Sequence, residues 1–161
     1  MDADDIRRRA LELFSQGYAA QLQGELGQAV DLYTESIACC PTAEAYTFRG
    51  WAYSFQGNYE QAIEECLQAI ALDPDFGNPY NDIGAYLIEQ GKLDEAVGWL
   101  QKAARAPRYD SPFFAWFNLG RVYERLWKLD KAEASFARAL ECNPGYAPAR
   151  HAWRRLRARW N

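Results

Sequence analysis

The 161 residues suit one compact domain or one short array of repeats, and 49% of them are hydrophobic, which is too many for a disordered chain. The net charge of −4 disfavours generic nucleic-acid binding, and no run approaches the ~18 apolar residues of a membrane span. No apolar segment follows the N-terminal Met-Asp-Ala-Asp-Asp, so we expect no secretory signal and a cytoplasmic protein. Apolar periodicity and Gly or Pro breaks predict helices, in chain order, at 4–21, 26–39, 43–56, 60–72, 77–90, 94–105, 113–127, 130–142 and 147–160.

Four series of small or helix-breaking residues recur along the chain at intervals near 34 residues, with Pro107 one residue early. The series are Gly17, Gly50, Gly84 and Gly120; Ala29, Ala62, Ala96 and Ala132; Ser36, Ala69, Ala103 and Ala139; and Pro41, Pro74, Pro107 and Pro144. Each unit therefore reads as two helices joined by a turn such as Gly57-Asn58. Since a mid-helix Gly costs about 1 kcal/mol against Ala, its recurrence predicts close contact between the two helices, with Gly facing Ala.

The fourth unit carries the spacing most completely, in Trp116, Leu119, Gly120, Tyr123, Ala132, Phe136, Ala139 and Pro144. This pattern resembles the tetratricopeptide repeat, and the resemblance covers residues 10–146. It implies an all-α fold in a single domain: a right-handed superhelical α-solenoid of four helix-turn-helix repeats plus a C-terminal capping helix. The repeats are expected at about 10–42, 43–76, 77–110 and 113–146, with the capping helix at 147–160.

The last segment is basic, because residues 147–161 hold five Arg and no acid. Trp153, Leu156 and Trp160 share one helical face and are predicted to cover the last repeat, while the Arg side chains point to water. The alternative is a contact surface for an acidic partner or a membrane surface. Residues 106–112 form the longest predicted loop and the one expected to be most mobile.

Residues suited to catalysis or metal binding are scarce. Cys39, Cys40, Cys66 and Cys142 form no zinc-type pattern with the lone His151, and no Walker-type, G-x-S-x-G or H-E-x-x-H motif is present. Acidic pairs such as Glu64-Glu65 lie on second helices and are expected to face solvent. We therefore predict no metal, no cofactor and no enzymatic activity.

Function is expected on the concave side, which the first helix of each hairpin would line. The residues predicted to face this groove are Phe14, Tyr18, Trp51, Phe55, Asn78, Asn81, Asp82, Phe117, Asn118 and Arg121. Either the aromatic rings are exposed and bind a partner, or packing between repeats consumes them. We predict a non-catalytic adaptor that binds a peptide or protein segment of unknown identity. A self-assembling homo-oligomer that uses exposed rings such as Trp127 is the alternative, and an enzyme or small-ligand binder is the third reading.

Tetratricopeptide co-chaperones resemble one another in a basic clamp that holds a chaperone's C-terminal carboxylate. Repeats one to three place Phe14, Tyr18, Phe48, Asn78 and Asp82 at the matching positions. Repeats two to four place Thr47, Trp51, Asp82, Phe114 and Asn118 there. The expected Lys/Asn/Asn/Lys/Arg set is missing from both, so we predict that the chain is not a carboxylate-clamp chaperone binder. The resemblance also implies that Asn118 occupies a position used by some members to grip a peptide backbone.

Overall fold

The computed structural model describes residues 2–159, and its regular structure there is helical, apart from an isolated parallel bridge between Phe76 and Arg108. The helices are α1 (Ala3–Leu22), α2 (Leu26–Cys39), α3 (Ala43–Phe55), α4 (Tyr59–Leu72), α5 (Asn78–Glu89), α6 (Leu93–Arg105), α7 (Pro112–Arg125), α8 (Leu129–Cys142) and α9 (Ala147–Arg157). Except at the end of α9, every predicted boundary lies within two residues of the observed one. Residue 160 falls outside the described residues, so the predicted place of Trp160 in the cap stays a prediction.

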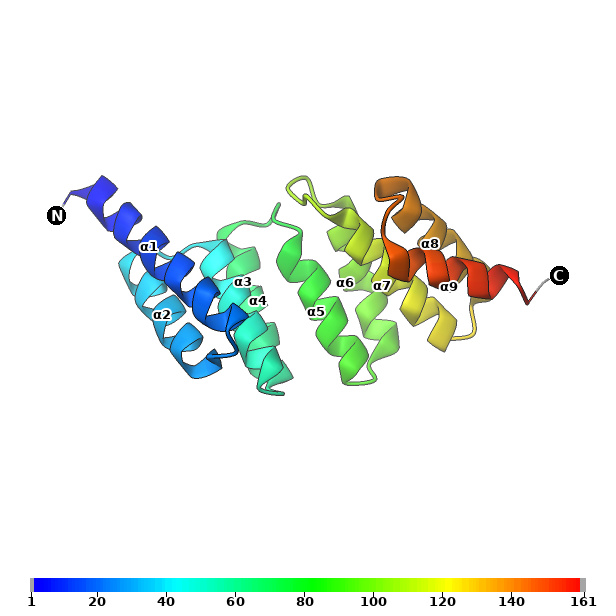
Figure 1. Cartoon of the computed structure of the whole chain (residues 1–161), viewed down its shortest axis with the longest axis horizontal. Coiled ribbons are helices and arrows are strands. Elements are labelled where there is room, and N and C mark those ends of the chain that lie inside the picture. The colour runs from blue at the N-terminus through cyan, green and yellow to red at the C-terminus, as the bar shows by residue number, and fades with distance from the viewer. Residues whose placement is uncertain (1, 160–161) are drawn as a thin grey trace. The chain divides into compact units, whose positions relative to one another are not determined.

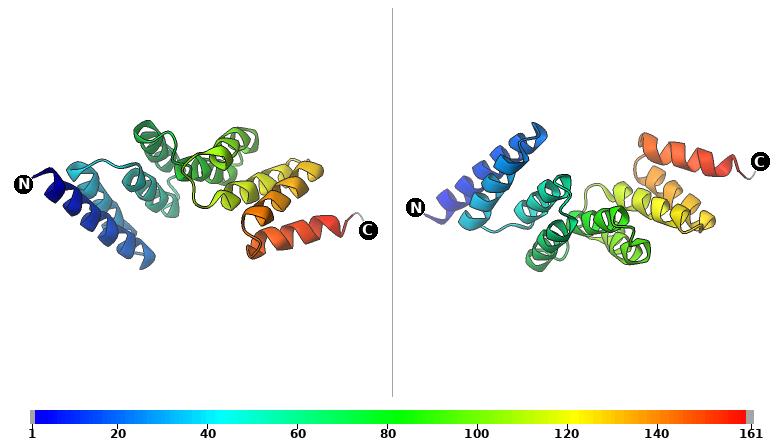
Figure 2. Two further views of the ribbon diagram at one scale, coloured as in Figure 1. Left: turned by 90° about the horizontal axis from the view of Figure 1, so that it is seen from above. Right: turned by 90° about the horizontal axis from the view of Figure 1, so that it is seen from below.

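Consecutive helices pack as antiparallel pairs, α1 with α2, α3 with α4, α5 with α6 and α7 with α8 (Figures 1 and 2). The chain divides into two compact units, unit 1 at Met1–Pro74 and unit 2 at Asp75–Asn161. Unit 1 holds the first two hairpins, and unit 2 holds the other two and α9, which packs on α8. The predicted all-α arrangement of four hairpins and a capping helix is confirmed, whereas the single-domain organisation stays a prediction.

The helix ends follow from local sequence. Asp2, Thr42 and Asn58 precede α1, α3 and α4, and the side chain of each accepts a hydrogen bond from a backbone N–H in the first turn, at 2.8, 3.1 and 3.3 Å. The turns between paired helices need a left-handed residue, supplied by glycine in the first three hairpins and by Trp127, with φ of 57°, in the fourth.

The recurring glycine of each first helix lies against the second helix of the same hairpin. A Cβ at Gly17, Gly84 or Gly120 would stand 2.8, 2.4 or 2.3 Å from the side chain of Tyr33, Leu100 or Phe136. Three of the four glycines thus face a bulky residue, where Ala was predicted. In the second hairpin the equivalent position is the small Cys66, and a Cβ at Gly50 would meet the backbone oxygen of Ala62 at 2.9 Å.

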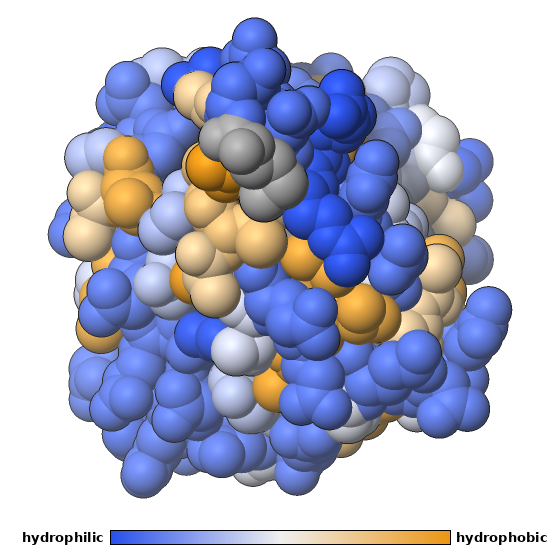
Figure 3. Space-filling model, turned by 90° about the vertical axis from the view of Figure 1, so that its left-hand side faces the viewer, coloured by the Kyte–Doolittle hydropathy of each residue, from blue (hydrophilic) through white to orange (hydrophobic). Residues whose placement is uncertain are grey.

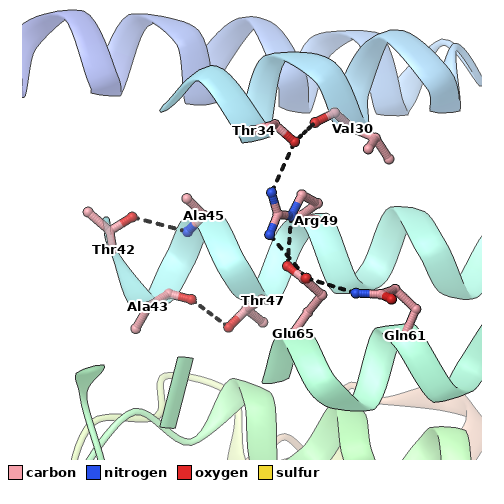
Figure 4. A network of polar contacts seen from close by, with 9 residues as sticks. All are labelled: Val30, Thr34, Thr42, Ala43, Ala45, Thr47, Arg49, Gln61 and Glu65. Atoms are coloured by element: carbon pink, nitrogen blue, oxygen red, sulfur yellow. Dashed lines mark hydrogen bonds and ion pairs between the residues drawn. The ribbon is translucent and has the colours of Figure 1, made fainter. Parts of the chain in front are cut away.

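A buried ion pair joins the helices of the second hairpin. The Arg49 guanidinium donates to both carboxylate oxygens of Glu65, at 2.7 and 3.0 Å, and only 6% of the Glu65 side chain is exposed (Figure 4). Thr34 of α2 accepts a further bond from Arg49 at 3.0 Å, and Gln61 donates to Glu65 at 3.2 Å. The prediction that Glu65 faces solvent is therefore wrong. A Cβ at Gly50 would stand 3.0 Å from the Cβ of Glu65, so the glycine of α3 leaves room for Glu65 at this helix contact.

The long loop before α7 is tied to the segment that precedes α5. Arg108 donates from its backbone N–H to the Asp75 carbonyl at 3.0 Å and accepts from the Gly77 N–H at 2.9 Å. The Tyr109 ring lies where a Cβ at Gly77 would be, at 2.5 Å, so only glycine fits there. These contacts hold the loop, expected to be the most mobile, against the start of unit 2.

The capping helix covers the last hairpin. Ala152 and Leu156 are buried in one cluster with Ala132 and Phe136 of α8, and Trp153 packs against its edge. The guanidinium of Arg157 stacks over the Trp153 ring at 4.9 Å, and other Arg side chains of α9, such as Arg154, are exposed. The apolar face of α9 thus meets α8, as the amphipathic pattern predicts.

Two helical glycines should respond to alanine in opposite directions. Gly50→Ala should lower the free energy of unfolding, because overpacking against backbone costs about 1–3 kcal/mol and outweighs the gain of about 1 kcal/mol in helix propensity. Gly98→Ala in α6 keeps only the propensity gain, since nothing lies within 4 Å of its added Cβ, and should raise that free energy. Urea unfolding followed by circular dichroism measures both. The packing account fails if Gly50→Ala is as stable as Gly98→Ala.

Candidate functional site

The first helices of unit 1 carry a contiguous set of aromatic rings, here called the aromatic face: Phe14 and Tyr18 of α1 with Phe48, Trp51 and Phe55 of α3. Phe48 lies at its centre, with its ring centroid 5.2 Å from that of Phe14, 5.6 Å from that of Tyr18 and 5.8 Å from that of Trp51. Phe55 follows at 5.3 Å from Trp51. Spacing of this kind is favourable for aromatic pairs, so the rings support one another across two helices.

The aromatic face is graded from buried to exposed. Phe14 and Phe48 pack on the core around the fully buried Tyr33, whereas Tyr18 is 39% and Phe55 60% exposed. The Tyr33 hydroxyl donates to Gln21 at 2.8 Å, and burial raises the pKa of this phenol. Packing therefore partly buries Phe14, one of the residues predicted to line the groove. The outer rings, Tyr18 and Phe55, lie at the surface.

Unit 2 carries a polar arrangement on the equivalent helices, here called the amide network: Asn81 of α5 with Asn118 and Arg121 of α7. The Asn118 amide donates to the Asn81 side-chain oxygen at 3.1 Å, and Arg121 donates to the Asn118 oxygen at 3.2 Å. Asn118 is buried, while Asn81 and Arg121 are half-buried. Phe117 lies beside it, 5.7 Å from the Phe136 ring and 5.3 Å from the Tyr146 ring.

Asp82 follows Asn81 and is half-buried, as is Asn78 at the first residue of α5. Burial raises the pKa of Asp82 to about 7, and a hydrogen bond from the Asn81 side chain opposes part of that rise. Burial, and then the charge of Asp82, raise the pKa of the Tyr109 phenol. An acid that titrates near neutral pH thus lies next to the amide network.

Two aromatic residues of the site, Phe48 and Tyr146, were not among the residues predicted to line the groove. Phe48 was considered only as a clamp position, yet it is the centre of the aromatic face. Tyr146, just before α9, contacts Phe113, Phe114 and Phe117 with centroids 5.0 to 5.5 Å apart. Its place just before the predicted capping helix, two residues after Pro144, was the available signal.

Unit 1 also has a cavity of about 450 Å³ beside the aromatic face, lined mainly by Ala10, Leu11 and Phe14 of α1 together with Ser36 and Cys40. The end view of the molecule shows a largely hydrophilic surface interrupted by separate hydrophobic areas (Figure 3). Among residues 2–159, no three His, Cys, Asp or Glu side chains gather as a metal site would require. No helix in that range has the length and apolarity needed to cross a membrane.

Repeated antiparallel helix pairs with glycine at the helix contacts, closed by an amphipathic helix, define the class of α-helical repeat proteins. Sequence models of the tetratricopeptide repeat match residues 43–76, 65–98 and 113–146. The chain belongs to the tetratricopeptide repeat family. It is a protein-interaction module of that family.

The relatives that match this chain are proteins of different kinds. The heat-shock protein cognate co-chaperone sgt12 of Aspergillus fumigatus is 34% identical over 96 residues, 59% of this chain and 28% of the relative. The probable UDP-N-acetylglucosamine–peptide N-acetylglucosaminyltransferase SPINDLY of Hordeum vulgare is 28% identical over 148 residues, 86% of this chain but 15% of the relative. The chain thus spans less than a third of either relative. Tetratricopeptide modules are generally non-catalytic, and the second relative shows that an enzyme can carry them.

Among solved structures, PilF of Pseudomonas aeruginosa superposes with a TM-score of 0.86 over 95% of this chain and 68% of that chain. The sequence identity is 23%, so the likeness shows the fold alone.

The raised pKa of Asp82 predicts a pH-dependent stability. Since the pKa is 3.8 in ordinary surroundings and about 7 in the folded chain, the protonated acid stabilises the folded state at low pH. That contribution should be lost as the pH rises from about 4 to about 7. Asp82→Asn removes the titration, so the Tm of the wild type minus that of the variant should fall across this interval. Asp31→Asn, at an exposed position of α2, is the control, and a pH-independent difference for Asp82→Asn would contradict the assignment.

Proposed function

We propose that the chain is a non-catalytic adaptor that binds a peptide or protein segment on the first helices of its hairpins. The observation that carries the proposal is the aromatic face, whose outer rings lie in water at a cost of roughly 25 cal/mol per Å². Contiguous exposed rings with buried neighbours are typical of protein-binding sites, where Trp and Tyr supply much of the binding energy. Phe14 and Phe48 hold the outer rings in place, so a partner would meet a preformed surface.

The amide network supports a second kind of contact in unit 2. An asparagine side chain has two N–H donors and two acceptor lone pairs, and a guanidinium has five donors. The bonds from Asn118 to Asn81 and from Arg121 to Asn118 orient these groups without exhausting their capacity. Such groups suit the N–H and C=O of an extended backbone, and the neighbouring Phe117 suits an apolar side chain.

We further propose that the partner is not held as a chaperone tail by a carboxylate clamp. The sgt12 relative is named a co-chaperone, so the comparison raises that possibility. At the clamp positions of unit 1, however, Phe14, Tyr18 and Phe48 are packed against one another with centroids 5.2 and 5.6 Å apart. Aromatic rings carry no cation to pair with a carboxylate, so these positions favour an apolar segment.

Truncating one ring in each unit, on the aromatic face of unit 1 and beside the amide network of unit 2, should weaken partner binding without unfolding the chain. Trp51→Ala combined with Phe117→Ala removes one half-buried ring from each unit and should reduce recovery of a bound partner at least about tenfold. Quantitative pull-down with the full chain as bait, followed by mass spectrometry, gives the recovery. Trp116→Ala is the matched control, because that half-buried ring stacks with Arg138, which belongs to α8. Unchanged recovery with the double variant, confirmed as folded by circular dichroism, would remove both surfaces from contention.

Trp127 favours a second candidate function, self-association. Its side chain is 78% exposed, and its φ of 57° is a conformation that the other three hairpins assign to glycine. A bulky residue there costs about 1–2 kcal/mol and gains no compensating burial within the chain. Contact with a second copy would bury this ring and give the strained position a role.

Trp127→Gly tests self-association with little risk to the fold, because glycine occupies the same turn position at Gly24, Gly57 and Gly91. The variant should unfold at a higher urea concentration than the wild type, since the left-handed strain is relieved. If the ring forms an interface, sedimentation velocity across concentrations should show the wild type associating and the variant remaining monomeric. A wild type that is monomeric at every concentration removes this candidate.

A further inference from the structure

A second cavity, of about 320 Å³, lies in unit 2 between α7 and α9, and we call it the Arg cavity. Its floor is apolar and consists of Phe117, the almost fully buried Phe136 and Ala152. Its walls carry Arg121 and Arg125 from α7 and Arg155 from α9. The volume is within the range of small binding pockets, and the combination of an apolar floor with cationic walls is selective for the ligand's charge.

The three guanidinium groups are held by different partners. Arg155 donates to both oxygens of Glu124, at 2.7 and 2.8 Å, so these two charges largely neutralise each other. Arg125 donates to the Ile88 carbonyl at 3.3 Å, a neutral acceptor that orients the group and leaves its charge uncompensated. Arg121 donates to the Asn118 oxygen and stands 3.7 Å from Glu89, whose side chain is half exposed to solvent. The walls therefore keep a net positive charge at fixed positions.

From these contacts we infer that the Arg cavity binds an acidic peptide segment, with an apolar side chain on the Phe117–Phe136 floor and flanking carboxylates on Arg121 and Arg125. A guanidinium has five N–H donors, so each can bind a carboxylate while keeping its present bond. The inference rests on the proposed function and specifies the chemistry of the partner at unit 2. It also gives the basic α9 a role besides capping, because Arg155 forms one wall.

Glu124 makes the inference testable by a gain of binding. Its carboxylate is the acid of the cavity wall, and it competes with a ligand carboxylate for Arg155. Glu124→Gln removes that competitor and adds one unit of positive charge, so an acidic peptide should bind more tightly. If Glu124 served only to hold α9 in place, Glu124→Gln would weaken the binding of an acidic peptide instead.

The experiment measures fluorescence anisotropy of three labelled, amidated peptides, DELFDE, its neutral twin NQLFNQ and its small-side-chain twin DEAADE, against the full chain. We expect DELFDE to bind most tightly and with an affinity that falls as salt is added. Arg121→Gln with Arg125→Gln should weaken DELFDE at least about tenfold, because the charges are lost while polar groups remain for Asn118 and Ile88. Glu124→Gln should strengthen it. Arg8→Gln with Arg138→Gln removes the same charge at exposed positions elsewhere and should change the affinity by less than about twofold.

Several outcomes would overturn the inference. If NQLFNQ binds as tightly as DELFDE, charge has no role in binding. If DEAADE binds as tightly as DELFDE, the apolar floor has no role. If the Arg8 and Arg138 variant loses as much affinity, the peptide is attracted by the overall charge of the protein. If Glu124→Gln weakens binding, Glu124 has a structural role. Tighter, Arg121-dependent binding to vesicles of phosphatidylserine and phosphatidylcholine would assign the cavity to a membrane. Because Trp51 lies outside the Arg cavity, a pull-down with Trp51→Ala alone tests the adaptor proposal separately, so that proposal can hold while the Arg cavity fails.

Discussion

In each hairpin a glycine of the first helix lies against the second helix, and the rest of the structure depends on this contact. Tyr33, Leu100 and Phe136 occupy the space that a Cβ would need at Gly17, Gly84 and Gly120. The bulky residue is itself buried, so one contact both sets the distance between the helices and places a large side chain in the core. The remaining surface of the first helix is then left for other contacts, and it carries the aromatic face and the amide network.

The spacing of small residues predicted the hairpins because a helix contact and a turn are both local features. Which residue faces the glycine was harder to predict. The sequence offered Ala and a bulky residue on the same helical face, and only the depth of the groove between the helices decides which of them reaches the glycine. Glu65 shows the same limit. Its burial depends on Gly50, which leaves room for its Cβ, and on Arg49, sixteen residues earlier, so an outer-face assignment from the helix alone was wrong.

For the candidate site, the sequence could indicate which rings share a helical face, but not how far each ring is exposed. Helical periodicity places Phe14 with Tyr18, and Trp51 with Phe55, on shared faces. Trp51 and Phe55 contact each other, whereas Phe14 and Tyr18 each contact Phe48 of the neighbouring hairpin. How far each ring is buried depends on the neighbouring hairpin, because Phe48 fills the space between α1 and α3 and shields Phe14 more than Tyr18. Likewise, the link from Asn118 to Asn81 spans 37 residues and needs two first helices to lie side by side, which composition cannot reveal.

Capping and binding need not compete for α9. A helix can bury only one stripe of its surface, and in α9 that stripe is Ala152 and Leu156 against α8. The remaining surface is basic because the segment holds five Arg and no acid, and Arg155 is turned toward α7, where it meets Glu124. A neutral polar cap would close the hairpin stack equally well. The positive charge beside an apolar floor therefore goes beyond what capping requires, and an acidic segment is the ligand class to which that charge is complementary.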